Sequence, residues 1–212
     1  MLRLCPAPAP ALRCVLTALG SPAAVREPRT PALRAVQGPL SAELPLPFHL
    51  LGGSHGAGAA GGTGTASGPA GRTTGAPPRT RLAGWRFLIR CGERSIAAAD
   101  TTLTPDGWSF SHFFEGPYVP ATERALAQAD ALGTPYQPRL LGVPGLYMLA
   151  LWLHTDVESD GTGTAPGPAD LLVPLSPAPP GFAAHHLYRA ADLLPVIGLR
   201  LPPPPLLDSA TA

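Results

Sequence analysis

The stretch that decides the fold is Trp85-Arg86-Phe87-Leu88-Ile89-Arg90-Cys91, WRFLIRC. Every second residue is bulky and apolar or a cysteine, and two of the three residues between them are arginine. This period of two is that of a β-strand with one buried face. Two more strand-like segments follow after short turns, at 95–103 and 108–114. In the last of them, alternation puts four side chains on one face: Trp108, Phe110, His112 and Phe114. The three segments predict an antiparallel meander.

The period changes after the meander. Residues 120–132 have helical spacing, begin with a proline and are followed by Gly133, which suits a helix end. The apolar stretch 146–154, LYMLALWLH, does not alternate, which is typical of a central strand covered on both faces. Shorter strands are expected at 136–141 and 170–175, and a second helix within 184–199, whose limits Pro195 leaves open. The segments predict an α+β fold, with an antiparallel sheet of about five to six strands in the order βββαβββα backed by two helices.

The first 84 residues differ from the rest in composition. They contain a single aromatic residue, Phe48, although aromatic side chains supply much of the area that a core buries. We therefore expect a disordered arm rich in Pro, Ala and Arg over 1–51 and a flexible Gly/Ala/Thr/Pro-rich linker over 52–81. One α+β domain then covers 82–200, and an extended Pro-rich tail covers 201–212.

Missing residue types exclude several function classes. All fifteen basic residues are arginine, and the chain has no lysine and no asparagine. A phosphate-loop lysine, a Schiff-base lysine, the lysine and asparagine of protein kinases and an N-glycosylation site are therefore unavailable. Residues 56–61, GAGAAG, match the dinucleotide-binding pattern of glycines. No helix can follow them in so glycine-rich a context, and no acidic residue appears until Glu93, so we interpret the match as linker composition.

Charge and cysteine content bear on partners and location. Residues 1–84 carry eight arginines against two glutamates, whereas the remainder is acidic. Scattered arginines without aromatic neighbours form no stacking platform, so no specific nucleic-acid partner is expected. There is no apolar run long enough to span a membrane. The three cysteines lack metal spacing, which favours a reducing, cytoplasmic location. Two alternatives stay open for the start of the chain: an organelle transit peptide, or a start codon assigned too early, with the true beginning near residue 80.

One enzymatic hypothesis is a thiol site. Cys91 would be the nucleophile, His112 the base, and Asp100 or Asp106 the group that orients the histidine. The alternative is that Cys91 is a core residue, because it shares a face with Trp85. A serine-hydrolase interpretation fails by the same alternation, which should keep Ser111 and His112 on opposite faces.

Two metal hypotheses concern the loop after residue 154. Asp156, Glu158 and Asp160, followed by a glycine, resemble the first half of a calcium loop, since oxygen ligands stand at alternate positions. The twelfth position, where calcium loops have a glutamate, is Gly167. The alternative is a solvated acidic loop. A second set shares Asp156 and includes three histidines without a recognised metal spacing: His154, His185 and His186.

The strand-to-helix turn at 115–118 is where we expect a ligand, with Glu115 and Tyr118 at the rim of a pocket, since such loops commonly carry sites. No catalytic motif is complete, and no cofactor is indicated. The sequence therefore predicts an accessory binding domain that engages a protein partner or a small ligand. The competing hypotheses are the thiol enzyme built from Cys91, His112 and Asp100, and the calcium loop at 156–161.

Overall fold

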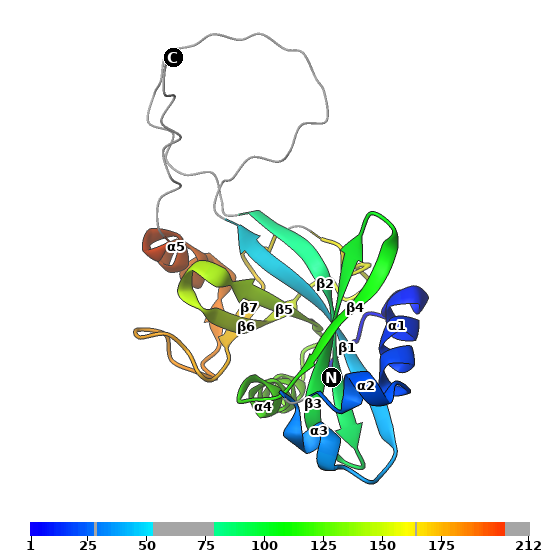
Figure 1. Cartoon of the computed structure of the whole chain (residues 1–212). Helices are drawn as coiled ribbons and strands as arrows, with labels where there is room; N and C mark the ends of the chain where they lie inside the picture. The colour runs from blue at the N-terminus through cyan, green and yellow to red at the C-terminus, as the bar shows by residue number, and fades with distance from the viewer. Residues whose placement is uncertain (28, 53–78, 164, 202–212) are drawn as a thin grey trace, which may run out of the picture.

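The computed structural model describes residues 1–27, 29–52, 79–163 and 165–201, which form one eight-stranded sheet with helices on both faces (Figure 1). The strand order across the sheet is β4-β3-β2-β1-β5-β6-β7-β8. The strands are β1 Leu40–Gly52, β2 Arg79–Cys91, β3 Arg94–Thr104, β4 Gly107–Phe114, β5 Gln137–Val143, β6 Met148–His154, β7 Leu171–Pro174 and β8 Tyr188–Arg189. The helices are α1 Ala9–Leu19, α2 Pro22–Val25, α3 Pro31–Ala35, α4 Tyr118–Asp130 and α5 Ala190–Arg200, with a 3₁₀ turn η1 at Pro144–Leu146.

The α+β class is confirmed, but the sheet is larger than expected and is mixed. Six of the eight strands correspond to segments predicted as strands, and the two added members are β1, at the centre, and β8, at one edge. β1 pairs antiparallel with β2 and parallel with β5 through Phe48–Leu50. The prediction of a wholly antiparallel sheet is therefore wrong, because β1 joins the meander to the β5–β7 half in parallel register.

The disordered arm expected over residues 1–51 is corrected by the same strand. Its proline-rich sequence LPLPFHLL is extended, as expected, but it is paired on both sides. The prolines fit because a β-bulge, with Leu44 at φ 50°, shifts the register between Glu43 and Leu46. Folded structure thus begins well before residue 82.

Helix α1 shows why a segment without aromatics can still fold. Its buried face consists of Ala11, Val15 and Ala18, and the last two pack in one cluster with Trp85 and Phe87 of β2. The sheet supplies the large side chains and the helix supplies small ones. The composition of one segment alone does not show that its small side chains pack against large side chains from a distant part of the chain. Most of the expected linker, with GAGAAG, and most of the expected tail lie outside the described residues.

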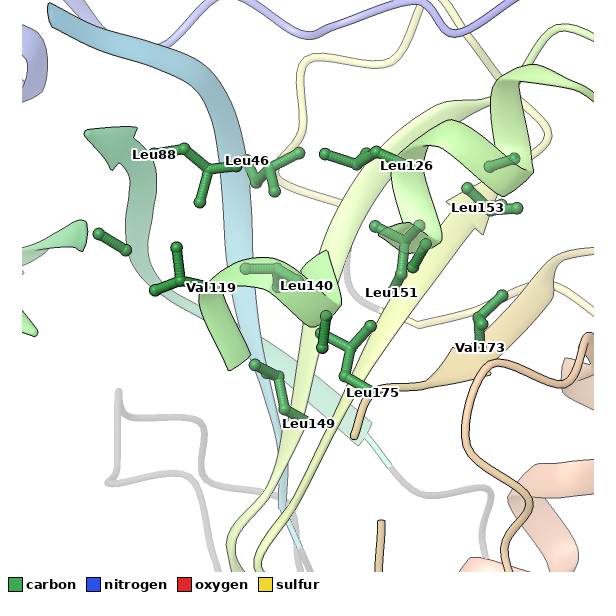
Figure 2. Packing of buried hydrophobic residues seen from close by; sticks show 14 residues of the cluster. Leu46, Leu88, Val119, Leu126, Leu140, Leu149, Leu151, Leu153, Val173 and Leu175 are labelled. Atoms are coloured by element: carbon green, nitrogen blue, oxygen red, sulfur yellow. The ribbon is translucent and has the colours of Figure 1, made fainter. Parts of the chain in front are cut away.

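The two faces of the sheet have separate cores. On one face, α4 packs through small side chains onto a leucine-rich cluster from β1, β2, β5, β6 and β7 (Figure 2). On the other face, α1 and α3 cover the aromatic residues of β2–β4, and α5 covers Trp152 and its neighbours on β5–β7. Helix α5 contains Pro195 within its length. No helix in the described part of the chain is long and apolar enough to cross a membrane.

The three-stranded meander is present, with one irregularity that matters for the site. β4 has a bulge: Thr101 pairs with Phe110 and Asp100 with His112, so Ser111 is an extra residue. Alternation reverses there, and Phe113 joins Phe110 in the core under α1. The expectation that Trp108, Phe110, His112 and Phe114 share one face is therefore wrong. The last two lie on the α4 side of the sheet.

Candidate functional site

An apolar groove of about 610 Å³ opens on the α4 side of the sheet. β1 and β5–β6 form its floor with Phe48, Leu50 and Leu149, and Phe114 of β4 and Tyr118 of α4 line its sides. Pockets of this size, mostly apolar and with a few polar groups, are typical of small-molecule sites. The polar side chains at this groove are Arg86 and His112, together with the tyrosine hydroxyls.

Gly142 lines the groove and places no side chain in it. It lies in register between Leu50 of β1 and Leu149 of β6. A Cβ atom built on Gly142 would lie 3.0 Å from both Phe48 Cε2 and Leu50 Cδ2. A side chain here would push these apolar groups aside or occupy the space between them. The absence of a side chain at this buried strand position therefore preserves the cavity.

A buried ion pair stands at one end of the groove. Arg86 donates from Nε and Nη2 to the two carboxylate oxygens of Asp100, both at 2.8 Å. The guanidinium also contacts two rings, with its Cζ 5.1 Å from the centre of Phe48 and 4.4 Å from that of Phe114. The side chains of Arg86 and Asp100 are only 10% and 13% exposed. Such a pair is costly to desolvate, and the bidentate geometry and ring stacking offset part of that cost.

His112 lies beside this pair, directly opposite Asp100 across β3 and β4. Its Nδ1 is 2.9 Å from Ser111 Oγ. The prediction that Ser111 and His112 lie on opposite faces is wrong, because the bulge at Ser111 breaks the alternation. His112 is exposed and lines the groove. Three titratable side chains, Arg86, Asp100 and His112, thus form a row across β2, β3 and β4.

The two residues expected at a pocket rim have different places. Tyr118 lines the groove, and its hydroxyl lies 3.1 Å from the carbonyl oxygen of Tyr147 and 3.2 Å from that of Pro177. Glu115 instead accepts hydrogen bonds from the backbone N–H groups of Ala32 and Leu33, at 3.1 and 2.8 Å. It therefore caps the first turn of α3, which sequence reasoning had left inside a disordered arm.

The thiol set is not brought together. Cys91 pairs with Arg94, whereas Asp100 pairs with Arg86, five residues earlier on β2. At the rise of a β-strand this separation is roughly 17 Å. Asp106, the other candidate orienter, lies in the turn at the far end of β3. His112 therefore has no thiol within reach, and Cys91 packs at the start of β1 near Gly38.

The acidic loop is organised by its own hydrogen bonds. Asp156 accepts from the N–H of Glu158, and Asp160 accepts from the N–H and hydroxyl of Thr162. The bonds from Thr162 lower the pKa of Asp160. No group of three or more His, Cys, Asp or Glu side chains with a metal-binding arrangement occurs among the residues that the structure describes. The calcium loop and the histidine site therefore stay predictions, and His154 bonds to Asp170.

Sequence reasoning missed a buried polar centre on the opposite face of the sheet. Asp170, fully buried, accepts hydrogen bonds from Trp152 Nε1 and His154 Nδ1, both at 2.8 Å. Thr155 donates to its other oxygen from the backbone and the hydroxyl, at 2.9 and 2.8 Å. Burial alone would raise the pKa of Asp170, but these bonds outweigh it and lower the pKa. The centre ties the loop after β6 to the sheet.

Arg139 and His49 extend this buried centre. Arg139 is fully buried, donates to Gln137 Oε1 and Ser159 Oγ at 2.8 Å, and stacks 4.7 Å from the centre of Trp152. His49 is also fully buried and lies 3.0 Å from the carbonyl oxygen of Gly161. Burial, together with the charge of Arg139, lowers the pKa of His49 to about 4. The available signal was a polar residue inside an apolar strand pattern, at PFHLL and QPRLL.

Comparison of this chain with family models, with curated proteins and with solved structures finds no match.

Proposed function

We propose that this chain binds a small, mainly apolar molecule in the groove between β1, β5, β6 and α4. The observation that carries the proposal is the cavity of about 610 Å³, preserved by the missing side chain at Gly142. Concave apolar sites of this kind release ordered water and remove ligand surface from solvent, which is the main source of affinity for apolar molecules. The sequence predicts an accessory domain that binds either a protein partner or a small ligand. The groove favours the small ligand.

The thiol enzyme has less support. Its nucleophile and base lie roughly 17 Å apart along the sheet, far beyond hydrogen-bond reach. A protein partner is the other occupant that the sequence left open. The groove is concave and has no side chain at Gly142, which favours a compact ligand that enters the cavity over a flat protein surface.

The test uses a neutral fluorescent probe, N-phenyl-1-naphthylamine, on the full chain. We expect its emission to rise on binding and to fall when decan-1-ol displaces it. Gly142→Ala should weaken probe binding several-fold, because its Cβ fills the floor. Gly198→Ala is the matched control, since a Cβ there meets nothing within 4 Å.

A second variant covers the case in which Gly142→Ala does not fold. Tyr147 lines the groove, is 90% exposed, and has φ 50°, a conformation that asparagine adopts readily. Tyr147→Asn should therefore keep the melting temperature and weaken probe binding. Absence of probe binding to the native chain, or equal binding by the native chain and Tyr147→Asn, would contradict the proposal.

A further inference from the structure

We propose that the ligand of the groove carries a carboxylate at one end, and that His112 and Arg86 hold it. This inference rests on the proposed function and adds the chemical class of the ligand: an apolar body with an anionic head. The inference rests on the hydrogen-bonding groups at the β2–β4 end of the groove. Arg86 and His112 can donate hydrogen bonds there, whereas the carboxylate of Asp100 is already paired.

The carboxylate at this end is already paired with a cation. Both oxygens of Asp100 take hydrogen bonds from Arg86, at 2.8 Å each. The carboxylate is also shielded, with its side chain 13% exposed. A cationic or donor-rich head group would therefore meet only a shielded carboxylate that is already paired with Arg86.

Arg86 offers a fixed donor edge. Its Nε and Nη2 bond to Asp100, and its Cζ also lies close to the rings of Phe48 and Phe114. Within the described residues, no hydrogen bond to its third nitrogen, Nη1, is present. Because rotation of the side chain would break the bidentate pair, this edge is held in place at the wall of the groove.

His112 supplies the second donor. When the Ser111 hydroxyl donates to Nδ1 at 2.9 Å, the neutral ring carries its proton on Nε2. Nε2 then acts as a donor, and a protonated ring would also donate from that atom. In this arrangement the ring of His112 presents an N–H group at Nε2.

Two donors and no free acceptor match a carboxylate, which accepts at both of its oxygens. Hydrogen bonds to an ionised acceptor are about twice as strong as those between neutral groups. A ligand with a carboxylate should therefore bind more tightly than one with a hydroxyl on the same apolar chain. The ion pair between Arg86 and Asp100 is neutral as a unit, so the N–H dipoles of Arg86 and His112 face the charge of the ligand.

The experiment compares three ten-carbon ligands that differ only in the head group: decanoate, decan-1-ol and decylamine. Each displaces N-phenyl-1-naphthylamine from the full chain at neutral pH. We expect decanoate to bind at least about tenfold more tightly than decan-1-ol, as expected for hydrogen bonds to a charged group, and decylamine to bind most weakly.

His112→Ala should lower the affinity for decanoate toward that for decan-1-ol and leave the alcohol unchanged. His186→Ala is the matched control, because His186 is exposed and stacks on Tyr188 away from the groove. Equal affinity of the native chain for decanoate and decan-1-ol would overturn the carboxylate inference and leave apolar binding intact. A decanoate preference that survives His112→Ala would overturn the role of His112. Failure of the probe and all three ligands to bind would overturn the proposed function itself.

Discussion

Replacement of Asp170 by asparagine tests the buried polar centre most directly. The carboxylate is fully buried, and one oxygen accepts from Trp152, His154 and the backbone N–H of Gly167, each at 2.8 Å. The other accepts from the backbone and hydroxyl of Thr155. Asparagine has one acceptor and one donor group where the native residue has two acceptors.

The least costly arrangement turns the amide nitrogen toward Thr155. The threonine hydroxyl can then rotate and accept, but the N–H of Thr155 faces another N–H group and stays unpaired. One unpaired buried donor costs about 1–3 kcal/mol, and the three remaining bonds lose their charge assistance. Relief from burying a charge offsets part of this loss. We expect Asp170→Asn to lower the free energy of unfolding by about 3 kcal/mol.

Urea denaturation followed by tryptophan fluorescence measures this change, since Trp152 contacts the mutated group. Asp106→Asn is the control, because Asp106 is exposed in the β3–β4 turn. The pKa of Asp170 is lowered in the folded chain, so its stabilisation is present above the ordinary aspartate pKa and is lost as pH falls through the lower, native value. Asp170→Asn should remove that part of the acid sensitivity. A loss below about 1 kcal/mol would refute the assignment of Asp170 as the anchor of the loop.

Three further changes test other parts of the fold. The pKa of His49 is about 4 in the folded chain and about 6.5 when unfolded, so stability should fall by up to about 3 kcal/mol as pH drops between these values. Unfolding free energies across this range should show a flatter pH dependence for His49→Gln; an unchanged slope would contradict the shift. Gly84→Ala places a Cβ 1.8 Å from the carbonyl oxygen of Thr101, and we expect a loss of more than about 3 kcal/mol by denaturation, against no such loss for Gly198→Ala. Glu115→Ala removes the cap of α3 and should cost about 1 kcal/mol in a thermal melt, whereas a neutral result would leave α3 held by packing alone.

Much of the second half of the fold could be predicted from local patterns. The meander, the helix after it and the strand at 148–154 all follow from apolar spacing and turn residues, because each of these elements has a regular period. The groove could not be predicted in the same way. Tyr118 was expected at a pocket, but Gly142 and Arg86 acquire their roles only from the strands that lie beside them.

Where local pattern failed, pairing or packing between distant segments was the cause. The bulge at Ser111 has no signal in the alternation of β4, yet it turns His112 toward the groove. The capping role of Glu115 depends on α3, more than 80 positions earlier in the chain.

The sequence by itself determined the α+β class, the meander, the helix that became α4 and the exclusion of chemistry that needs lysine or asparagine. These follow from period, turn residues and composition, which are local properties. Only the tertiary structure decided that β1 lies at the centre of the sheet and that α1 covers its aromatic face. The physical reason is that the aromatics are on β2–β4 and the small side chains that cover them are on α1, so neither segment reveals its burial without the other.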